Sequence, residues 1–190
     1  MTMAQLMSHT AGFDVSAGYA QAGLRSGDLK EMIRRLAALP LAAQPGTDWR
    51  YGPSVDIQGH VVETLSGQRL DAYLAQHVFS PLKMPDTGFH VPPEKAPRVA
   101  RIHTYKDGRI VAGPPQAIPV TPPAFLSGGG GLLSTASDYF RFAQALLDGG
   151  VLEGARVLRP ETVRLMRRSV LAPGVKVDLY GPSQAGVGFG

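Results

Sequence analysis

The most informative segment of this 190-residue chain is Pro45-Gly-Thr-Asp-Trp-Arg-Tyr-Gly-Pro53, which runs directly into Ser54-Val-Asp-Ile-Gln-Gly-His-Val-Val-Glu-Thr-Leu-Ser-Gly67. Prolines and glycines interrupt helix and strand alike, so residues 45–53 are predicted to form a turn. Ser54 is a suitable N-cap for a helix that carries Val55 and Leu65 and stops at Gly67. A turn that leads into a helix is therefore predicted here.

Hydrophobic periodicity predicts helices on both sides of this segment. After Asp28, a suitable N-cap, four apolar side chains follow at the i, i+3, i+4, i+7 spacing of one buried stripe: Leu29, Met32, Ile33 and Leu36. Pro40 ends that helix, because proline lacks the N–H that a helix needs. Further helices are predicted at 2–8, 69–79, 136–148 and 160–168.

The helix predicted at 136–148 has its own start and stop signals. Thr135-x-x-Asp138 is similar to a capping box, with Asp in place of the usual Glu, and Gly149-Gly150 ends the helix. Its periodicity indicates one apolar stripe, which consists of Tyr139, Phe140, Ala143, Leu146 and Leu147. Because the sheet on which such a stripe would pack is expected outside the chain, we expect this face to be partly exposed.

Outside the helices, one short hairpin is predicted. Asp107-Gly108 lies between β-branched and aromatic residues of 102–111, which is the usual short-range signal for a two-residue turn. Residues 80–100 are rich in proline and are predicted to be irregular. Loops longer than about 12–15 residues are uncommon in a self-sufficient domain. Helices joined by such long loops therefore indicate that part of a larger fold is missing.

Composition excludes several classes of function. The chain has no Cys, which excludes disulfides, thiolate metal sites and a cysteine nucleophile. The net charge is +4, but the basic residues are scattered and no aromatic stacking surface accompanies them, so nucleic-acid binding is not predicted. The sequence contains no apolar run of membrane-spanning length, so no membrane segment is predicted.

The common nucleophile motifs do not fit convincingly. No Gly-x-Ser-x-Gly elbow occurs, and its nearest approach, Gly52-Pro-Ser-Val-Asp56, ends in Asp. Ser80-Pro-Leu-Lys83 matches Ser-x-x-Lys, in which a lysine takes the serine proton. That chemistry needs both residues on one face at the start of a buried helix. This match follows a predicted helix in a proline-rich stretch, so we interpret it as a chance match.

No metal or cofactor is predicted. The five histidines contain no i, i+3 or i, i+4 pair that would place two ligands on one helix face. Gly128–Gly131 precedes a helix, where an anion could bind, but no Gly-Lys-Ser/Thr follows. We interpret the four glycines as backbone packed where no side chain fits.

Five segments together are similar to the serine β-lactamase-like family, which includes class C β-lactamases, D-alanyl-D-alanine carboxypeptidases and family VIII carboxylesterases. The resemblance extends over nearly the whole chain. The segments that carry it are Leu6-Met-Ser-His-Thr-Ala-Gly-Phe13, Pro45-Gly-Thr-Asp-Trp-Arg-Tyr51, Gly59-x-x-x-Glu63-x-x-Ser-Gly67, Pro81-Leu-Lys-Met-Pro-Asp-Thr-Gly-Phe89 and Ser127-Gly-Gly-Gly-Gly-Leu-Leu-Ser-Thr-Ala-Ser-Asp-Tyr139. The resemblance implies an α+β, β-lactamase/transpeptidase-like fold. Residues 1–190 would be a partial domain, truncated at both ends: mainly the helical part plus one small hairpin, without most of the central antiparallel sheet.

One catalytic residue can be carried over from the family. Tyr51 matches the family tyrosine, a phenol that acts as general base or proton shuttle near an ammonium group. The following Gly52-Pro53 departs from the family's Tyr-x-Asn and Tyr-Ser patterns. No Asn is present to hold a β-lactam side chain, which favours esterase-like chemistry. The family's Ser-x-x-Lys nucleophile helix and its late Lys-Thr-Gly or Trp/His-Gly-Gly strand are expected outside the chain.

The resemblance implies a parent protein that hydrolyses a small-molecule ester, amide or peptide through an acyl-enzyme. The isolated 190-residue chain is expected to be inactive and to self-associate through exposed apolar helix faces. The alternative is a non-catalytic remnant or interaction module from a truncated or mis-started gene. No compartment is predicted, since a signal peptide could lie upstream of Met1.

Overall fold

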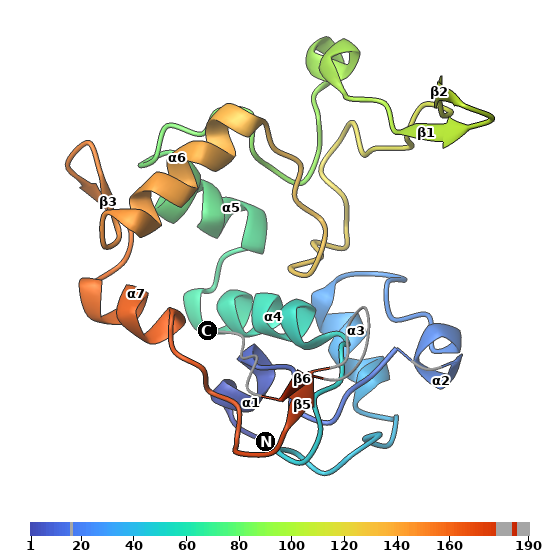
Figure 1. Cartoon of the computed structure of the whole chain (residues 1–190), viewed down its shortest axis with the longest axis vertical. Coiled ribbons are helices and arrows are strands. Elements are labelled where there is room, and N and C mark those ends of the chain that lie inside the picture. Colours follow the sequence, from blue (N-terminus) through green and yellow to red (C-terminus); the bar gives the residue numbers. More distant parts are fainter. Residues whose placement is uncertain (16, 178–183, 186–190) are drawn as a thin grey trace.

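A long central helix organises the chain in the computed structural model, which describes residues 1–15, 17–177 and 184–185. This helix, α4 (Ser54–Ser66), is contacted by α1 (Met3–Met7), α3 (Leu29–Leu36) and α5 (Leu70–Leu74). The short helix α2 (Ala17–Gln21) lies beyond α3 (Figure 1). The N-terminal half is thus a layer of helices around α4.

Helix α3 forms as the sequence predicts. The Asp28 side chain accepts a hydrogen bond of 2.8 Å from the backbone N–H of Glu31, which satisfies one of the free donors of the first turn. Leu29, Met32 and Leu36 are buried along one stripe. Met32 is fully inaccessible to solvent.

The first apolar core lies between these helices and the loops around them. Buried residues of helices α1 to α5 meet there with residues of the loop after α1 and of two later loops, namely Leu6, Ala11, Phe13, Tyr19, Leu29, Met32, Leu36, Ile57, Leu70, Phe89 and Leu126. This core fixes the loop that precedes α2 and the loop that ends at Leu126 against α4. Both loops line the cleft described below.

A second, smaller core joins the later elements. Helix α5 continues as the π-helical turn η1 (Ala75–Phe79), where the sequence predicted regular helix to residue 79. Phe79, Leu82 and Met84 pack with Ala145 of α6 (Ala136–Leu147). After α6 come the ribbon β3 (Val151–Leu152) and β4 (Ala155–Arg156), and then α7 (Pro160–Met166), which begins at Pro160 as predicted.

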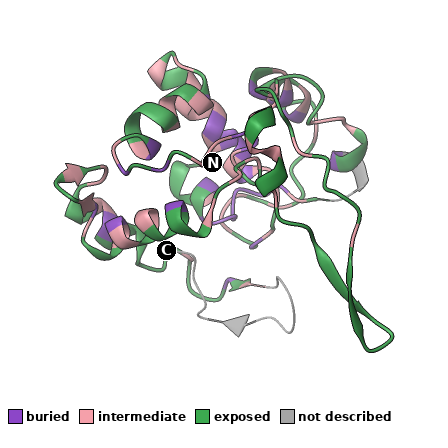
Figure 2. Cartoon of the chain, turned by 90° about the horizontal axis from the view of Figure 1, so that it is seen from above, coloured by how far each residue is buried: buried purple, intermediate pink, exposed green. Residues whose placement is uncertain are grey.

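Three two-stranded ribbons occur in the described residues, whereas the sequence predicted one. The predicted hairpin is confirmed: β1 (His103–Lys106) pairs with β2 (Arg109–Ala112) across a turn in which Asp107 and Gly108 both have positive φ. Its residues are all exposed, and it projects away from the helices (Figure 2). The other ribbons are β3–β4 and β5 (Lys176–Val177) with β6 (Gln184–Ala185). Strands of two residues are too short to leave a periodic pattern.

Three local predictions were wrong. The residue before α4 is Pro53 and no side chain caps the helix; Ser54 is its first residue and is buried. Residues 93–98, predicted to be irregular, form the 3-10 helix η2 (Pro93–Arg98). In α6, Thr135 accepts the expected bond from the Asp138 N–H, but the Asp138 carboxylate accepts from another loop and does not complete a capping box.

The apolar stripe predicted for α6 faces solvent in large part. Tyr139, Phe140 and Leu147 are each more than 60% exposed, while Phe142 and Ala145 pack into the second core. Leu65, at the end of α4, is also exposed. Apolar side chains are therefore uncovered on several of the described helices, most of all on α6. None of the helices in the described ranges has the length and apolar character needed to cross a bilayer.

Candidate functional site

Tyr51 lies at the end of the turn that leads into α4, and its ring is supported on one side. The ring stacks on His9 with a centroid distance of 5.0 Å and an interplanar angle of 29°. Trp49, which is buried, lies 6.5 Å from Tyr51 and meets the His9 ring edge-on at 5.8 Å. Tyr51 itself is 48% exposed, so its ring is held in place but remains accessible.

The loop that carries His9 is fixed by backbone pairing to the Tyr51 turn. The Arg50 N–H donates to the His9 carbonyl at 2.9 Å, and the Gly46 N–H donates to the Thr10 carbonyl at 2.7 Å. His9 has a φ of 56°, in the left-handed region that a residue with a side chain rarely adopts. The loop holds this conformation beside the candidate catalytic residue, where such strain is often found.

Burial of the His9 imidazole lowers its pKa. The ring is 7% exposed, and removal from water disfavours the charged form. His9 is therefore neutral near pH 7, and the Tyr51 ring stacks on a neutral imidazole.

A cleft of about 440 Å³ opens beside Tyr51. Its walls combine apolar side chains, such as Phe125 and Tyr19, with the carboxylates of Asp14 and Asp56. Arg50 forms an ion pair of 3.8 Å with Asp14, which ties the Tyr51 turn to the loop before α2. An apolar cleft with a few polar groups at fixed positions is typical of a small-molecule site.

One wall of this cleft is the glycine loop, residues 128–131, which contributes Gly129. The buried Asp56 carboxylate accepts hydrogen bonds from the Ser127 hydroxyl at 2.7 Å and the Gly129 N–H at 3.0 Å. A Cβ on Gly128 would lie 2.5 Å from the Val55 carbonyl oxygen. The prediction that this backbone packs where no side chain fits is confirmed at Gly128.

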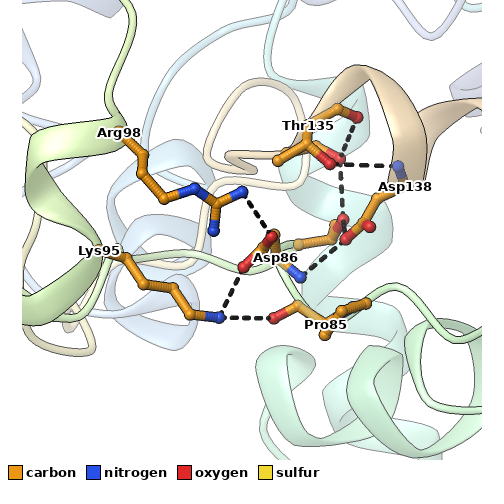
Figure 3. A network of polar contacts seen from close by, with 8 residues as sticks. Pro85, Asp86, Lys95, Arg98, Thr135 and Asp138 are labelled. Atoms are coloured by element: carbon orange, nitrogen blue, oxygen red, sulfur yellow. Dashed lines mark hydrogen bonds and ion pairs between the residues drawn. The ribbon is translucent and has the colours of Figure 1, made fainter.

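A second cleft, of about 620 Å³, lies between the loop at 85–92, η2 and the start of α6. Figure 3 shows its polar wall, in which Asp86 accepts from Lys95 at 2.6 Å and from Arg98 at 2.8 Å. These two cations, with Arg98 first, lower the pKa of Asp86 to about 2. The Asp138 carboxylate accepts from the Asp86 N–H at 2.8 Å, so the start of α6 holds this loop. These charges are paired with one another.

Ser80 and Lys83 are not arranged as a nucleophile and its base. Ser80 follows the π-helical turn and is exposed, and Lys83 has a positive φ. The Lys83 ammonium donates to Glu153 at 2.7 Å. The interpretation of this motif as a chance match is thus supported.

The other motifs weighed in the sequence do not assemble into a ligand site. Helix α6 begins at Ala136 and is capped by Thr135, so the glycine loop does not form the helix start that would attract an anion. In the described part of the chain, no group of three or more His, Asp or Glu side chains is placed to hold a metal ion.

The sequence proposed Tyr51 as a candidate catalytic residue but gave no role to the residues that contact it. His9 belongs to one of the five motifs, yet no role was assigned to it, because its contact with Tyr51 joins segments about 40 residues apart. Asp56 was considered only as the final residue of a failed nucleophile elbow. An aspartate in a first helical turn suggests a role at a site only when its hydrogen-bond partners are known. The partners of Asp56 are Ser127 and the glycine-loop residue Gly129.

Comparison with known proteins gives one family and several relatives. The profile of the β-lactamase family matches residues 1–190. Mycobacterium tuberculosis protein Rv1367c is 38% identical over 198 residues, which cover 97% of this chain and 49% of the relative. Esterase EstB of Burkholderia gladioli is 32% identical over 218 residues, which cover 100% of this chain and 53% of the esterase.

A solved structure gives the same result for the fold. EstCE1, described as a hydrolase with promiscuous acyltransferase activity, superposes with a TM-score of 0.70 at 26% identity, over 87% of this chain and 49% of EstCE1. The predicted α+β, β-lactamase/transpeptidase-like fold is confirmed. The chain spans about half the length of the curated relatives that it matches.

Proposed function

Because the chain belongs to the β-lactamase family, we propose that the whole protein is a serine hydrolase that forms an acyl-enzyme with a small-molecule ester, amide or peptide. Residues 1–190 would be one part of its hydrolase domain. In this proposal Tyr51 transfers a proton between the attacking nucleophile and the leaving group. The nucleophilic serine and its lysine come from outside these residues.

The observation that carries the proposal is the setting of the Tyr51 side chain. Its ring is held against His9 and Trp49, the residue is about half exposed, and it is one of the residues that line a cleft of about 440 Å³. A general acid or base must be fixed in orientation and still reach the reacting atoms. The supported and accessible ring of Tyr51 agrees with such a role.

Ester substrates are favoured over β-lactams within this class. Gly52 and Pro53 follow Tyr51, so the asparagine that would hold a β-lactam side chain is replaced. The names of two relatives agree with this preference, since EstB is an esterase and EstCE1 a hydrolase with acyltransferase activity. We therefore propose esterase activity for the whole protein.

The test is Tyr51→Phe in the whole protein, with Tyr139→Phe as the matched control. Phenylalanine keeps the ring stacked on His9 and removes only the hydroxyl. General acid–base groups contribute on the order of 10²–10⁴ in rate, so kcat on p-nitrophenyl butyrate should fall within that range with little change in melting temperature. Tyr139 lies on α6, is exposed and lines neither cleft, so its variant should keep full activity.

Two results would count against the proposal. A Tyr51→Phe enzyme within about threefold of the wild-type kcat would make Tyr51 a packing residue. The isolated 190-residue chain should not hydrolyse the same ester above a matched blank. A burst of product from that chain that is stoichiometric with protein and is abolished by Ser80→Ala would show that Ser80 is a nucleophile.

A further inference from the structure

One buried carboxylate connects the Tyr51 turn to the glycine loop. Asp56 lies in the first turn of α4, five residues after Tyr51, and is 6% exposed. Its Oδ1 atom accepts two hydrogen bonds, from the Ser127 hydroxyl at 2.7 Å and from the Gly129 N–H at 3.0 Å. The segment that carries Tyr51 thus reaches a loop more than 70 residues further along the chain.

The same loop is pressed against the first turn of α4. A Cβ on Gly128 would lie 2.5 Å from the Val55 carbonyl oxygen, so only glycine allows this approach. Gly129, Asp56 and Tyr51 all line the cleft of about 440 Å³. The two bonds to Asp56 therefore set where one wall of the cleft stands relative to the Tyr51 ring.

A carboxylate suits this position for two physical reasons. The start of a helix carries partial positive charge, which favours a negative side chain in the first turn. Hydrogen bonds to a charged acceptor are also shorter and stronger than bonds between neutral groups. Without this acceptor, the buried Ser127 hydroxyl would lose its partner inside the protein, and the exposed residue Gly129 would lose the bond that holds its N–H against α4.

We propose that Asp56 is a positioning residue, which holds the glycine loop at the distance from Tyr51 that the substrate requires. The proposal rests on the proposed hydrolase function for its catalytic consequence. Its structural part, the holding of the loop by Asp56, does not depend on that function. Asp56 acts through the loop, and no proton transfer is assigned to it.

The experiment compares Asp56→Ala, Asp56→Asn and Ser127→Ala with the control Asp71→Asn. Asp71 is a first-turn aspartate of α5 that lines neither cleft, so its variant controls for the loss of a helix-terminal charge. Ser127→Ala removes one of the two bonds and serves as a milder variant if Asp56→Ala folds poorly. Asn keeps an oxygen where Oδ1 stands and can accept the same two bonds.

The first readout is hydrogen exchange at the Gly129 amide, measured well below the melting temperature. We expect exchange to accelerate in Asp56→Ala, to accelerate less in Ser127→Ala, and to be close to wild type in Asp56→Asn and Asp71→Asn. Exchange at Gly129 that stays unchanged in Asp56→Ala would overturn the proposal, whether or not the protein hydrolyses esters.

The second readout is kcat/KM for hydrolysis of the ester by the whole protein. Misplacing substrate by about 1 Å can cost about 10²-fold, so kcat/KM of Asp56→Ala should fall by about 10- to 100-fold, with partial rescue in Asp56→Asn. A purely structural carboxylate would lower the melting temperature and leave kcat/KM of the folded enzyme within about threefold of wild type, which would overturn the positioning role. Full activity in Tyr51→Phe together with these Asp56 effects would remove only the role of Tyr51.

Discussion

The close contact between Gly128 and helix α4 leads to a sharp prediction about two neighbouring glycines. In Gly128→Ala the new methyl group would lie 2.5 Å from the Val55 carbonyl oxygen and 3.2 Å from its carbonyl carbon. That carbonyl belongs to the backbone of α4, so it cannot move aside without disturbing the helix. At Gly130 a methyl group would meet nothing within 4 Å.

The expected size of the effect follows from these distances. Forcing an extra methyl group into a packed site costs about 1–3 kcal/mol of unfolding free energy. For a chain of this length 1 kcal/mol shifts the melting temperature by about 2–4 °C, so Gly128→Ala should melt about 2–12 °C lower. Gly130→Ala should melt at the wild-type temperature or slightly above, because alanine reduces the freedom of the unfolded chain by about 0.4–1 kcal/mol.

The assay is thermal and urea unfolding of the three proteins, followed by far-ultraviolet circular dichroism. Protein concentration has to be the same throughout, because association changes the apparent stability. Equal melting temperatures for Gly128→Ala and Gly130→Ala would refute the packing of the loop against α4. A larger loss in Gly130→Ala would place the tight contact at the wrong glycine.

Two further predictions concern the isolated 190-residue chain. Burial lowers the pKa of His9 below its ordinary value of 6.5. As pH falls through that value, the unfolded state therefore binds more protons than the folded state. Stability should be fully present above about pH 7 and should decrease toward about pH 5. Urea midpoints at these two pH values should therefore differ less in His9→Phe than in wild type, and an equal difference in both proteins would contradict this reasoning. The second prediction is self-association, because Phe140, Leu147 and Leu65 expose apolar surface. Size exclusion with light scattering that shows a compact monomer, together with no binding of a hydrophobic dye, would contradict it.

Local signals predicted the elements that local contacts determine. Helix α3 has its cap at Asp28 and its buried stripe between Leu29 and Leu36, and the β1–β2 hairpin has its turn at Asp107-Gly108 between its own strands. In both cases the signals on which the prediction depends lie within the segment itself. Such elements can be predicted from sequence without knowledge of the rest of the fold.

The helix at α6 was predicted from its own start and stop signals, but periodicity did not identify the surface on which it packs. The stripe through Tyr139 and Phe140 is apolar, but the second core lies on the side of Phe142 and Ala145. That core is supplied by the distant segment around Leu82. Which of two apolar faces is buried therefore depends on tertiary contacts that the helix sequence does not contain.

The candidate site was predicted only at Tyr51, and that prediction came from a family resemblance. The positions of His9 and Asp56 depend on pairings across long stretches of chain, such as the bond from Asp56 to Ser127. A histidine in a loop and an aspartate in a first helical turn are common residues at common places. Only the packing of the Tyr51 turn against the His9 loop and the glycine loop distinguishes them.

The bond between Asp56 and Ser127 also bears on the order in which the chain folds. Its partners are 71 positions apart, whereas the β1–β2 hairpin closes through two turn residues. The entropy lost on closing a loop grows with the logarithm of its length, and non-local contacts are the slow ones to form. We expect the hairpin and α3 to form early and the cleft beside Tyr51 to close among the last events. A nascent chain would then present its helices to solvent well before the cleft beside Tyr51 is complete.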